Sequence, residues 1–245
     1  MQFSFDPALE FTLPIQKELE DMTRQAFATC KVQFSSPEDH PLPQCQFNIG
    51  GTLGNTGNRR GIHISFSNEA PFDMPSAKLE QLIHHEMVHF FQANLHKIEP
   101  DRYLPQWFYE GMAVAFSGQS VIARNSHLDD DYKYMGPGTS WENNFLTTTY
   151  AQGKASSYDS WGAMFIYAVT EQQSILPEHA VYGADGDLRA QVSAAECAKA
   201  LAIISTAFEK GLKEGIEKGF NFALTHHTGK QQVTESGFRK FLAPD

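Results

Sequence analysis

Cysteine is scarce in this chain of 245 residues, and no apolar run approaches the length of a membrane span. The three cysteines, Cys30, Cys45 and Cys197, are too few and too scattered for a disulfide framework or a cysteine-based zinc site. We predict that they are ordinary core or surface residues, with a Cys30–Cys45 bridge as the alternative. Because a transmembrane helix needs about 18 or more consecutive apolar residues, none is expected.

Basic charge is also limited. The chain has 19 Lys and Arg residues against 29 Asp and Glu residues, which gives a formal net charge of −10. Proteins that bind nucleic acids normally have basic patches that neutralise phosphates, so we expect no nucleic-acid partner. The first residues, MQFSFDPALEF, lack the basic and apolar regions of a signal peptide, which favours the cytoplasm unless a leader has been removed.

Apolar residues, in contrast, are abundant. Hydrophobic residues make up 41% of the chain and aromatic residues 12%, with 19 Phe among them. A chain of this composition can bury a sizeable core, so we expect a globular protein. The length allows one large domain or two small ones, and we predict a single domain over residues 1–245.

The order of the predicted elements indicates the fold class. Ile62, Ile64 and Phe66 alternate with polar residues as in a half-buried strand, and Ser193 with Glu196 forms a capping box that begins a helix. One helix, a few strands and then mostly helices are typical of an α+β protein. The predicted helices cover residues 14–29, 76–96, 105–116 and 157–173, and a further helix begins at 193 and weakens or breaks near Gly211, Gly215 and Gly219. The predicted strands cover residues 31–35, 44–50 and 62–67. Residues 50–61 are predicted to be a turn-rich connection.

The stretch QLIHHEMVHFFQ, residues 81–92, contains four ionisable side chains within an apolar helix. His85 and His89 are four residues apart and therefore lie on the same helix face, with Glu86 beside them. This is the H-E-x-x-H pattern, in which two imidazoles bind zinc and the carboxylate stands next to the metal without binding it. Zinc lowers the pKa of a bound water, and Glu86 can accept its proton as the water attacks a carbonyl. We predict His85 and His89 as zinc ligands and Glu86 as the general base.

An ordinary helix whose histidines hydrogen-bond in the core or face solvent is the alternative. The flanking residues predict that the helix is buried, since they are apolar over most of its circumference: Leu82, Ile83, Met87, Val88, Phe90 and Phe91. Buried imidazoles and a buried carboxylate are costly when they have no partner. Because a metal ion removes this cost, we favour the zinc site.

A third ligand is expected, because catalytic zinc is held by three protein side chains with one position left open. Some twenty residues downstream, LPQWFYEGMAVAFSG places Glu110 among apolar neighbours. The combination of H-E-x-x-H with W-x-x-E-G-x-A (Trp107, Glu110, Gly111 and Ala113) resembles the gluzincin metallopeptidases, which include the thermolysin-like and M1-aminopeptidase-like enzymes. The resemblance covers about residues 60 to 175. It implies a zincin-like core in which Glu110 is the third zinc ligand and Glu86 the general base.

The resemblance also implies two further features. In gluzincins the strand before the zinc helix is commonly the sheet edge that pairs with an extended substrate, and GIHISFS, residues 61–67, is in that place. The family often has a tyrosine after the third ligand that stabilises the oxyanion. Tyr158 resembles that tyrosine, with Tyr150 as the nearest rival and a plain packing role as the alternative.

One departure from the family concerns the acidic residue that many gluzincins place shortly after the third ligand, where it orients a zinc-bound histidine. The sequence GMAVAFSGQS after Glu110 contains no acid. Ser117, Gln119 or a backbone carbonyl could replace it, or the site is weakened.

The remaining polar clusters are expected to be unremarkable. We predict that His84 is a residue next to the ligands or at the surface and that His96 lies near a helix end. His226 and His227 are predicted to lie in a solvated loop, with a loose metal-binding pair as the alternative. The acidic run 129–131 lacks the ligand spacing of a calcium loop. The sequence contains no nucleophile elbow, P-loop or dinucleotide fingerprint that would indicate other chemistry.

Together these patterns predict a zinc-dependent peptidase with a peptide or protein substrate, an endopeptidase by default. Within the predicted single catalytic domain, residues of about 1–75 would form a helix and strands, about 76–175 the zinc-site helices, and about 176–245 a helical C-terminal part. Two alternatives stay open: a zinc-binding module of peptidase fold with little or no activity, and hydrolysis of a non-peptide substrate at the same site.

Overall fold

The computed structural model describes residues 1–7, 12–35, 41–49, 55–66, 76–119, 157–170, 180–182, 188–190 and 192–229. The chain divides into two compact units, Met1–Glu99 and Pro100–Asp245. The described part is mostly helical with a small mixed sheet, which agrees with the predicted α+β class. That the whole chain acts as one catalytic domain stays a prediction.

The first unit contains a four-stranded sheet in the order β1-β2-β4-β3. β2 (Gln44–Ile49) lies parallel to both β1 (Gln2–Phe5) and β4 (Gly61–Phe66), while β3 (Thr56–Asn58) runs antiparallel to β4. The strands β2 and β4 were predicted. β1 was not predicted, and β3 falls within the stretch that was interpreted as a turn-rich connection.

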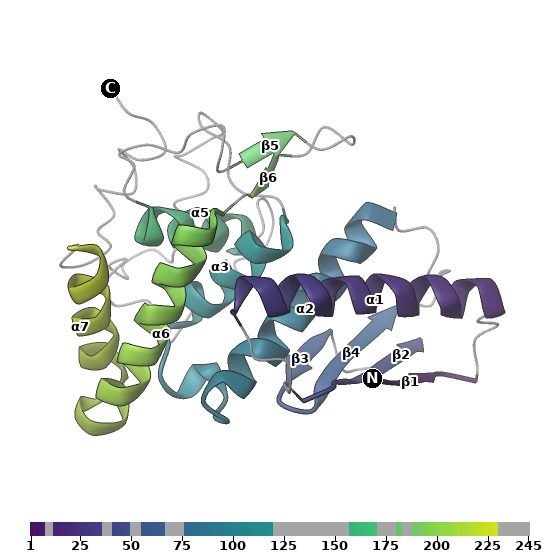
Figure 1. The fold of residues 1–245 in the computed structure, drawn as a ribbon, viewed down its shortest axis with the longest axis horizontal. Helices are drawn as coiled ribbons and strands as arrows, with labels where there is room; N and C mark the ends of the chain where they lie inside the picture. Colours follow the sequence, from purple (N-terminus) through teal and green to yellow (C-terminus); the bar gives the residue numbers. More distant parts are fainter. Residues whose placement is uncertain are drawn as a thin grey trace. The chain divides into compact units, whose positions relative to one another are not determined.

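Side chains alternate across this sheet, as the pleat of a strand requires. Cys45, Phe47 and Ile64 are buried on one face, whereas Gln44 and Gln46 are exposed on the other. The buried face is covered by helices of the same unit (Figure 1).

The two helices of this unit are α1 (Leu13–Gln33) and α2 (Ser76–Leu95). α2 contacts β3 and β4. The Phe91 ring on α2 lies 5.3 Å from the ring of Phe27 on α1 and 5.3 Å from the ring of Phe34, which is the C-cap residue of α1. The predicted strand 31–35 is therefore wrong, because residues up to Gln33 continue α1 and Phe34 packs against α2.

The second unit is built around α3 (Gln106–Ser117), which begins shortly after a 3₁₀ turn at Pro100–Arg102 and ends at Gly118 in the left-handed conformation. α3 packs against α5 (Ser157–Val169), and the Phe108 ring lies 5.2 Å from Phe165 and 5.1 Å from Phe220. A short hairpin of β5 (Ala180–Tyr182) and β6 (Leu188–Ala190) was not predicted.

A pair of helices, α6 (Ala194–Glu214) and α7 (Ile216–Thr228), completes the described part of this unit. The predicted capping box is present, since the Ser193 hydroxyl accepts from the Glu196 backbone and the Glu196 carboxylate accepts from the Ser193 backbone. The predicted break occurs at Gly215, which has a φ of 97°. α7 then returns so closely that a Cβ on Gly219 would lie 2.3 Å from the Gly211 nitrogen.

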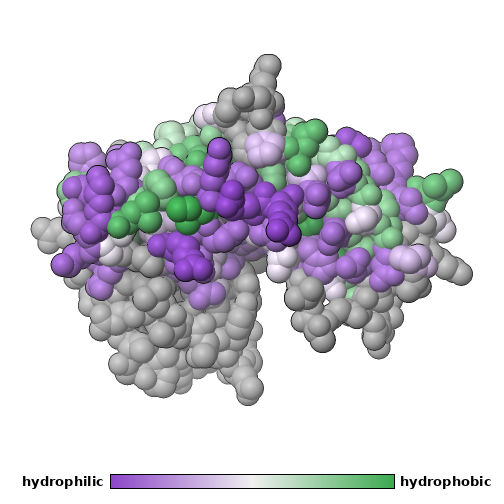
Figure 2. All heavy atoms as spheres, turned by 90° about the horizontal axis from the view of Figure 1, so that it is seen from below, coloured by the Kyte–Doolittle hydropathy of each residue, from purple (hydrophilic) through white to green (hydrophobic). Residues whose placement is uncertain are grey.

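Hydrophilic side chains dominate the described surface seen in Figure 2, with apolar side chains scattered among them. The large apolar residues that are exposed are distributed over several elements: Leu13, Val32, Leu42, Leu212 and Phe222. None of the helices in the described ranges combines the length and the apolar character that a membrane crossing requires.

The three cysteines are free, as predicted, and all three are buried; Cys30 and Cys45 form no bridge. Burial raises the pKa of the Cys45 thiol to about 12 and is the main cause that raises the pKa of Cys197 to about 11; it also raises the pKa of Cys30 well above its usual value. At pH 8 a thiol with a pKa near 11 is ionised to about one part in a thousand, and only the thiolate is nucleophilic.

We therefore expect Ellman's reagent at pH 8 to react slowly with the native protein and to detect three thiols once the protein is unfolded without reductant. Fewer than three thiols in the unfolded protein would reveal a disulfide. Rapid modification of the native protein would contradict the burial of the cysteines.

Candidate metal centre

His85, Glu86 and His89 lie on α2 in its most deeply buried part. The exposed fractions of these residues are 4%, 5% and 9%. As expected for residues four apart in a helix, both imidazoles are on one face, and their Nε2 atoms are 3.1 Å apart. The two ring planes are inclined by 82° to each other.

The apolar sequence around the three residues explains why this part of α2 is buried. Ile83, Met87, Val88, Phe90 and Phe91 are at most 1% exposed. Their side chains occupy most of the helix circumference and bury the polar residues between them. Any ligand that binds the folded protein through these side chains would add to its stability.

β3 packs directly against this segment of α2. A Cβ atom added to Gly57 would lie 1.9 Å from the backbone oxygen of Glu86 and 2.8 Å from the Cβ of His89. Only a residue without a side chain fits at this distance, which explains why glycine occupies position 57 in the sequence NTGN. The side-chain amide of Asn94, further along α2, donates to the Arg59 carbonyl oxygen at 3.1 Å and fixes the turn that follows β3.

Glu110 lies on α3 in the second unit and is partly exposed. The residues around it in the W-x-x-E-G-x-A pattern hold α3 in place. The Trp107 ring lies 5.7 Å from Phe220, and a Cβ on Gly111 would lie 2.1 Å from the Trp161 carbonyl oxygen. Gly111 therefore allows α3 and α5 to approach each other closely at the residue next to Glu110.

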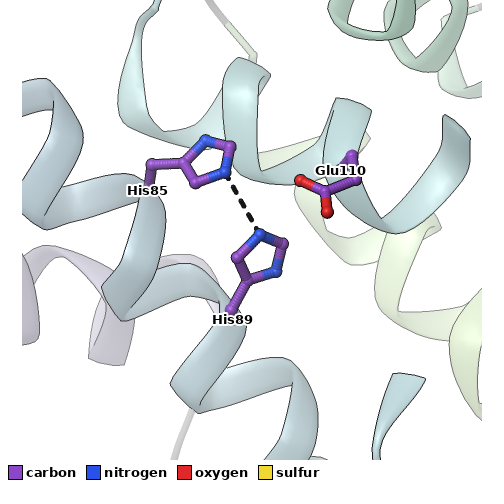
Figure 3. Close-up of side chains that lie close together, drawn as sticks. All are labelled: His85, His89 and Glu110. Carbon is purple, nitrogen blue, oxygen red and sulfur yellow. Dashed lines mark hydrogen bonds between the residues drawn. The ribbon is translucent and has the colours of Figure 1, made fainter. Parts of the chain in front are cut away.

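The ligand atoms of His85, His89 and Glu110 lie within 4.8 Å of one another, and this group could hold a metal ion. Figure 3 shows the two imidazoles and the carboxylate turned toward a common space. Two imidazole nitrogens and one carboxylate oxygen are a donor set that suits divalent transition metals, and three protein ligands leave a coordination position for water or substrate. The residues therefore fit a metal ion of this class.

No family model, curated protein or solved structure matches the chain.

His89 has a hydrogen-bond partner that the sequence did not suggest. The Nδ1 atom of His89 is 2.8 Å from Oε1 of Gln92, which is fully buried. Of the residues expected in this role, Ser117 donates its hydroxyl hydrogen to the Val114 carbonyl oxygen of its own helix, 3.2 Å away, and the backbone amide of Gln119 donates to the same oxygen at 3.0 Å. The signal that could have found Gln92 is its spacing, because residues three apart are neighbours on a helix surface.

His84 faces away from the metal group. Its Nε2 atom lies 3.1 Å from Oε1 of Gln33, so His84 connects α2 with α1. Burial, together with the proximity of His85, lowers the pKa of His84 to about 4. The His84 imidazole is therefore neutral around pH 7, and it packs between the two helices.

The other histidine predictions have mixed outcomes. His96 directly follows the end of α2, as predicted. His226 and His227 are in the last turn of α7 instead of a loop, and His227 Nε2 lies 2.7 Å from the Thr206 hydroxyl on α6. The prediction of a solvated loop is therefore wrong, because the chain turns at Gly215 and continues as a helix.

The predicted substrate edge also requires correction. Residues 61–66 form β4, which lies between β2 and β3 and so is not at the edge of the sheet. Among the strands that the structure describes, β3 is the one at the edge of the sheet beside α2. Tyr158 is in the first turn of α5, but its side chain lies outside the described residues, as do Tyr150 and the acidic run 129–131.

Proposed function

We propose that this protein is a zinc-dependent peptidase in which His85, His89 and Glu110 hold zinc and Glu86 is the general base. The observation that supports the proposal most strongly is the grouping of these three ligand atoms within 4.8 Å, next to a carboxylate that is 5% exposed. A site that served only to hold a structural ion would not need Glu86. The resemblance of the two motifs to gluzincins supports the same chemistry.

Zinc, when bound, would act as a Lewis acid that activates water and polarises the scissile carbonyl. Glu86 would accept the proton of the attacking water and deliver it to the leaving amine, so that the C–N bond breaks and the carboxylate is regenerated. The apolar residues on either side of Glu86 limit competing water around it. Tyr158, in the first turn of α5, is proposed to stabilise the oxyanion.

The edge strand β3 is the proposed binding surface for an extended peptide. It packs against α2 at Glu86 and His89, so a peptide paired with its outer edge would pass close to the general base. Main-chain pairing of this kind provides affinity without a strict sequence requirement, which suits an endopeptidase.

Metal analysis combined with a cleavage assay tests this proposal. We expect the purified protein to bind one zinc ion per chain and to cleave members of a mixed peptide library. Removal of zinc by a chelator should abolish cleavage, and added zinc should restore it. His85→Ala should lose both bound zinc and activity, because two remaining side chains bind zinc weakly.

His84→Gln is the matched control, because His84 precedes His85 on α2 but pairs with Gln33. This variant should keep its zinc and its activity. A wild-type protein without bound metal, or a His85→Ala variant that binds zinc as tightly as the wild type, would contradict the proposed site. A protein that binds zinc at this site but cleaves no peptide would instead be a zinc-binding module.

A further inference from the structure

We propose that Gln92 is a positioning residue that holds the His89 imidazole in the tautomer whose Nε2 lone pair faces the metal position. The inference rests on the proposed function in one respect, namely that His89 is a metal ligand. It adds a residue that lies outside both sequence motifs and that carries no charge.

The contact between the two side chains determines which nitrogen of His89 has the hydrogen. Gln92 Oε1 lies 2.8 Å from His89 Nδ1, and a carbonyl oxygen can only accept a hydrogen bond. Nδ1 is therefore the donor. In a neutral imidazole the other nitrogen, Nε2, then carries the lone pair that can accept a hydrogen bond or bind a metal, and Nε2 is the atom that approaches His85.

The burial of Gln92 makes this arrangement difficult to lose. Gln92 is 0% exposed, so water cannot take the place of its amide oxygen at Nδ1. Both residues are on α2 at a spacing of three, so the regular helix itself keeps them adjacent. If His89 turned or adopted the other tautomer, this buried hydrogen bond would be lost, which is unfavourable.

The same geometry makes the two histidines inequivalent before metal binds. With the Nε2 of His89 as the acceptor, the 3.1 Å contact between the two Nε2 atoms requires His85 to donate from Nε2. His89 is thus already in the form that binds a metal, whereas His85 must move its hydrogen from Nε2 to Nδ1. The cost of this change falls on His85 alone.

Two substitutions separate orientation from packing. Gln92→Met has a similar size but no oxygen acceptor, while Gln92→Glu retains an acceptor at the same position. We expect Gln92→Met to weaken zinc binding by about 10- to 100-fold, the usual effect of removing the hydrogen-bond partner of a metal-binding histidine, and Gln92→Glu to restore most of the affinity. Zinc affinity is measured by competition with a chromophoric chelator.

The second measurement needs no metal. Long-range ¹H–¹⁵N NMR of the metal-free protein reports the tautomer of each histidine, and we expect His89 to have its hydrogen on Nδ1 and His85 on Nε2. In Gln92→Met the preference of His89 should be lost. Thr23→Val is the matched control, since it removes a fully buried hydroxyl that donates to Leu19 in the same unit and should change neither zinc affinity nor tautomers.

Wild-type His89 with its hydrogen on Nε2, or a Gln92→Met variant that binds zinc as tightly as a zinc-binding wild type, would overturn the role of Gln92. A wild-type protein that binds no zinc would contradict the proposed function instead, and the tautomer of His89 would then still decide whether Gln92 positions this ring. If Gln92→Met does not fold, the tautomer of His89 in the wild type and the zinc affinity of Gln92→Glu decide whether Gln92 has this role.

Discussion

Replacing Glu86 with Gln is expected to lower kcat/KM for peptide cleavage by about 10²- to 10⁴-fold, the usual contribution of a general acid–base group, while one zinc ion per chain stays bound. The amide has the shape of the carboxylate but cannot accept a proton from water. Glu86 is 5% exposed, so neither bulk water nor buffer readily replaces it. Zinc content by mass spectrometry and cleavage of the best library peptide provide the two measurements.

Glu80→Gln is the control for this experiment, because Glu80 is an exposed glutamate on the same helix. It removes one negative charge from α2 and should leave both zinc content and activity unchanged. A Glu86→Gln variant within tenfold of the wild-type kcat/KM would exclude Glu86 as the general base. A Glu86→Gln variant that lost its zinc would assign Glu86 to metal binding.

Replacing Gly57 with Ala is expected to lower the free energy of unfolding by about 1–3 kcal/mol, the usual cost of an overpacked site, and to reduce activity as well. The new methyl group would lie 1.9 Å from the backbone oxygen of Glu86. A backbone atom cannot rotate away as a side chain can, so β3 or α2 has to move. Either movement displaces the proposed substrate edge from the general base.

Urea unfolding followed by circular dichroism measures the stability effect. Thr56→Ala in the same strand is the control, because Thr56 is exposed and its replacement should change the unfolding free energy by less than about 0.5 kcal/mol. A Gly57→Ala variant as stable and as active as the wild type would show that β3 and α2 are not in close contact at this position.

The parts of the fold that were predictable from sequence are those fixed by local patterns. α2 follows from apolar periodicity, and the start of α6 follows from the Ser193–Glu196 capping box. His85 and His89 share a face because any helix places residues four apart in this way. The grouping of Glu110 with them was suggested by the two motifs and not by any periodic signal.

The elements that the sequence did not indicate depend on partners distant in the chain. β3 is only three residues long and contains Gly57 between polar residues, so its strand character comes from pairing with β4. Residues 31–35 show the opposite error. Val32 and Phe34 alternate with polar residues as in a strand, but the helix continues, with Val32 78% exposed and Phe34 buried against Phe91.

Gln92 was missed for a different reason. The family pattern places the residue that orients a zinc-bound histidine after Glu110 on α3, whereas the acceptor found beside His89 lies on α2 itself. An amide is also a weaker signal than an acid, because glutamine occurs at many helix positions without any role at a site. Only the distance between Oε1 and Nδ1 distinguishes Gln92 from such a residue.

The close approach of α7 to α6 has a consequence for the order in which the chain folds. Gly211 and Gly219 are separated by a single turn at Gly215, so this pair of helices can form with little loss of chain entropy. The sheet of the first unit, in contrast, pairs Gln2 with Gln44, which requires a long segment to close. Pairing of distant segments is slow. We therefore infer that the helical pair forms early, and that the sheet that supports α2 and its residues His85 and His89 is completed late.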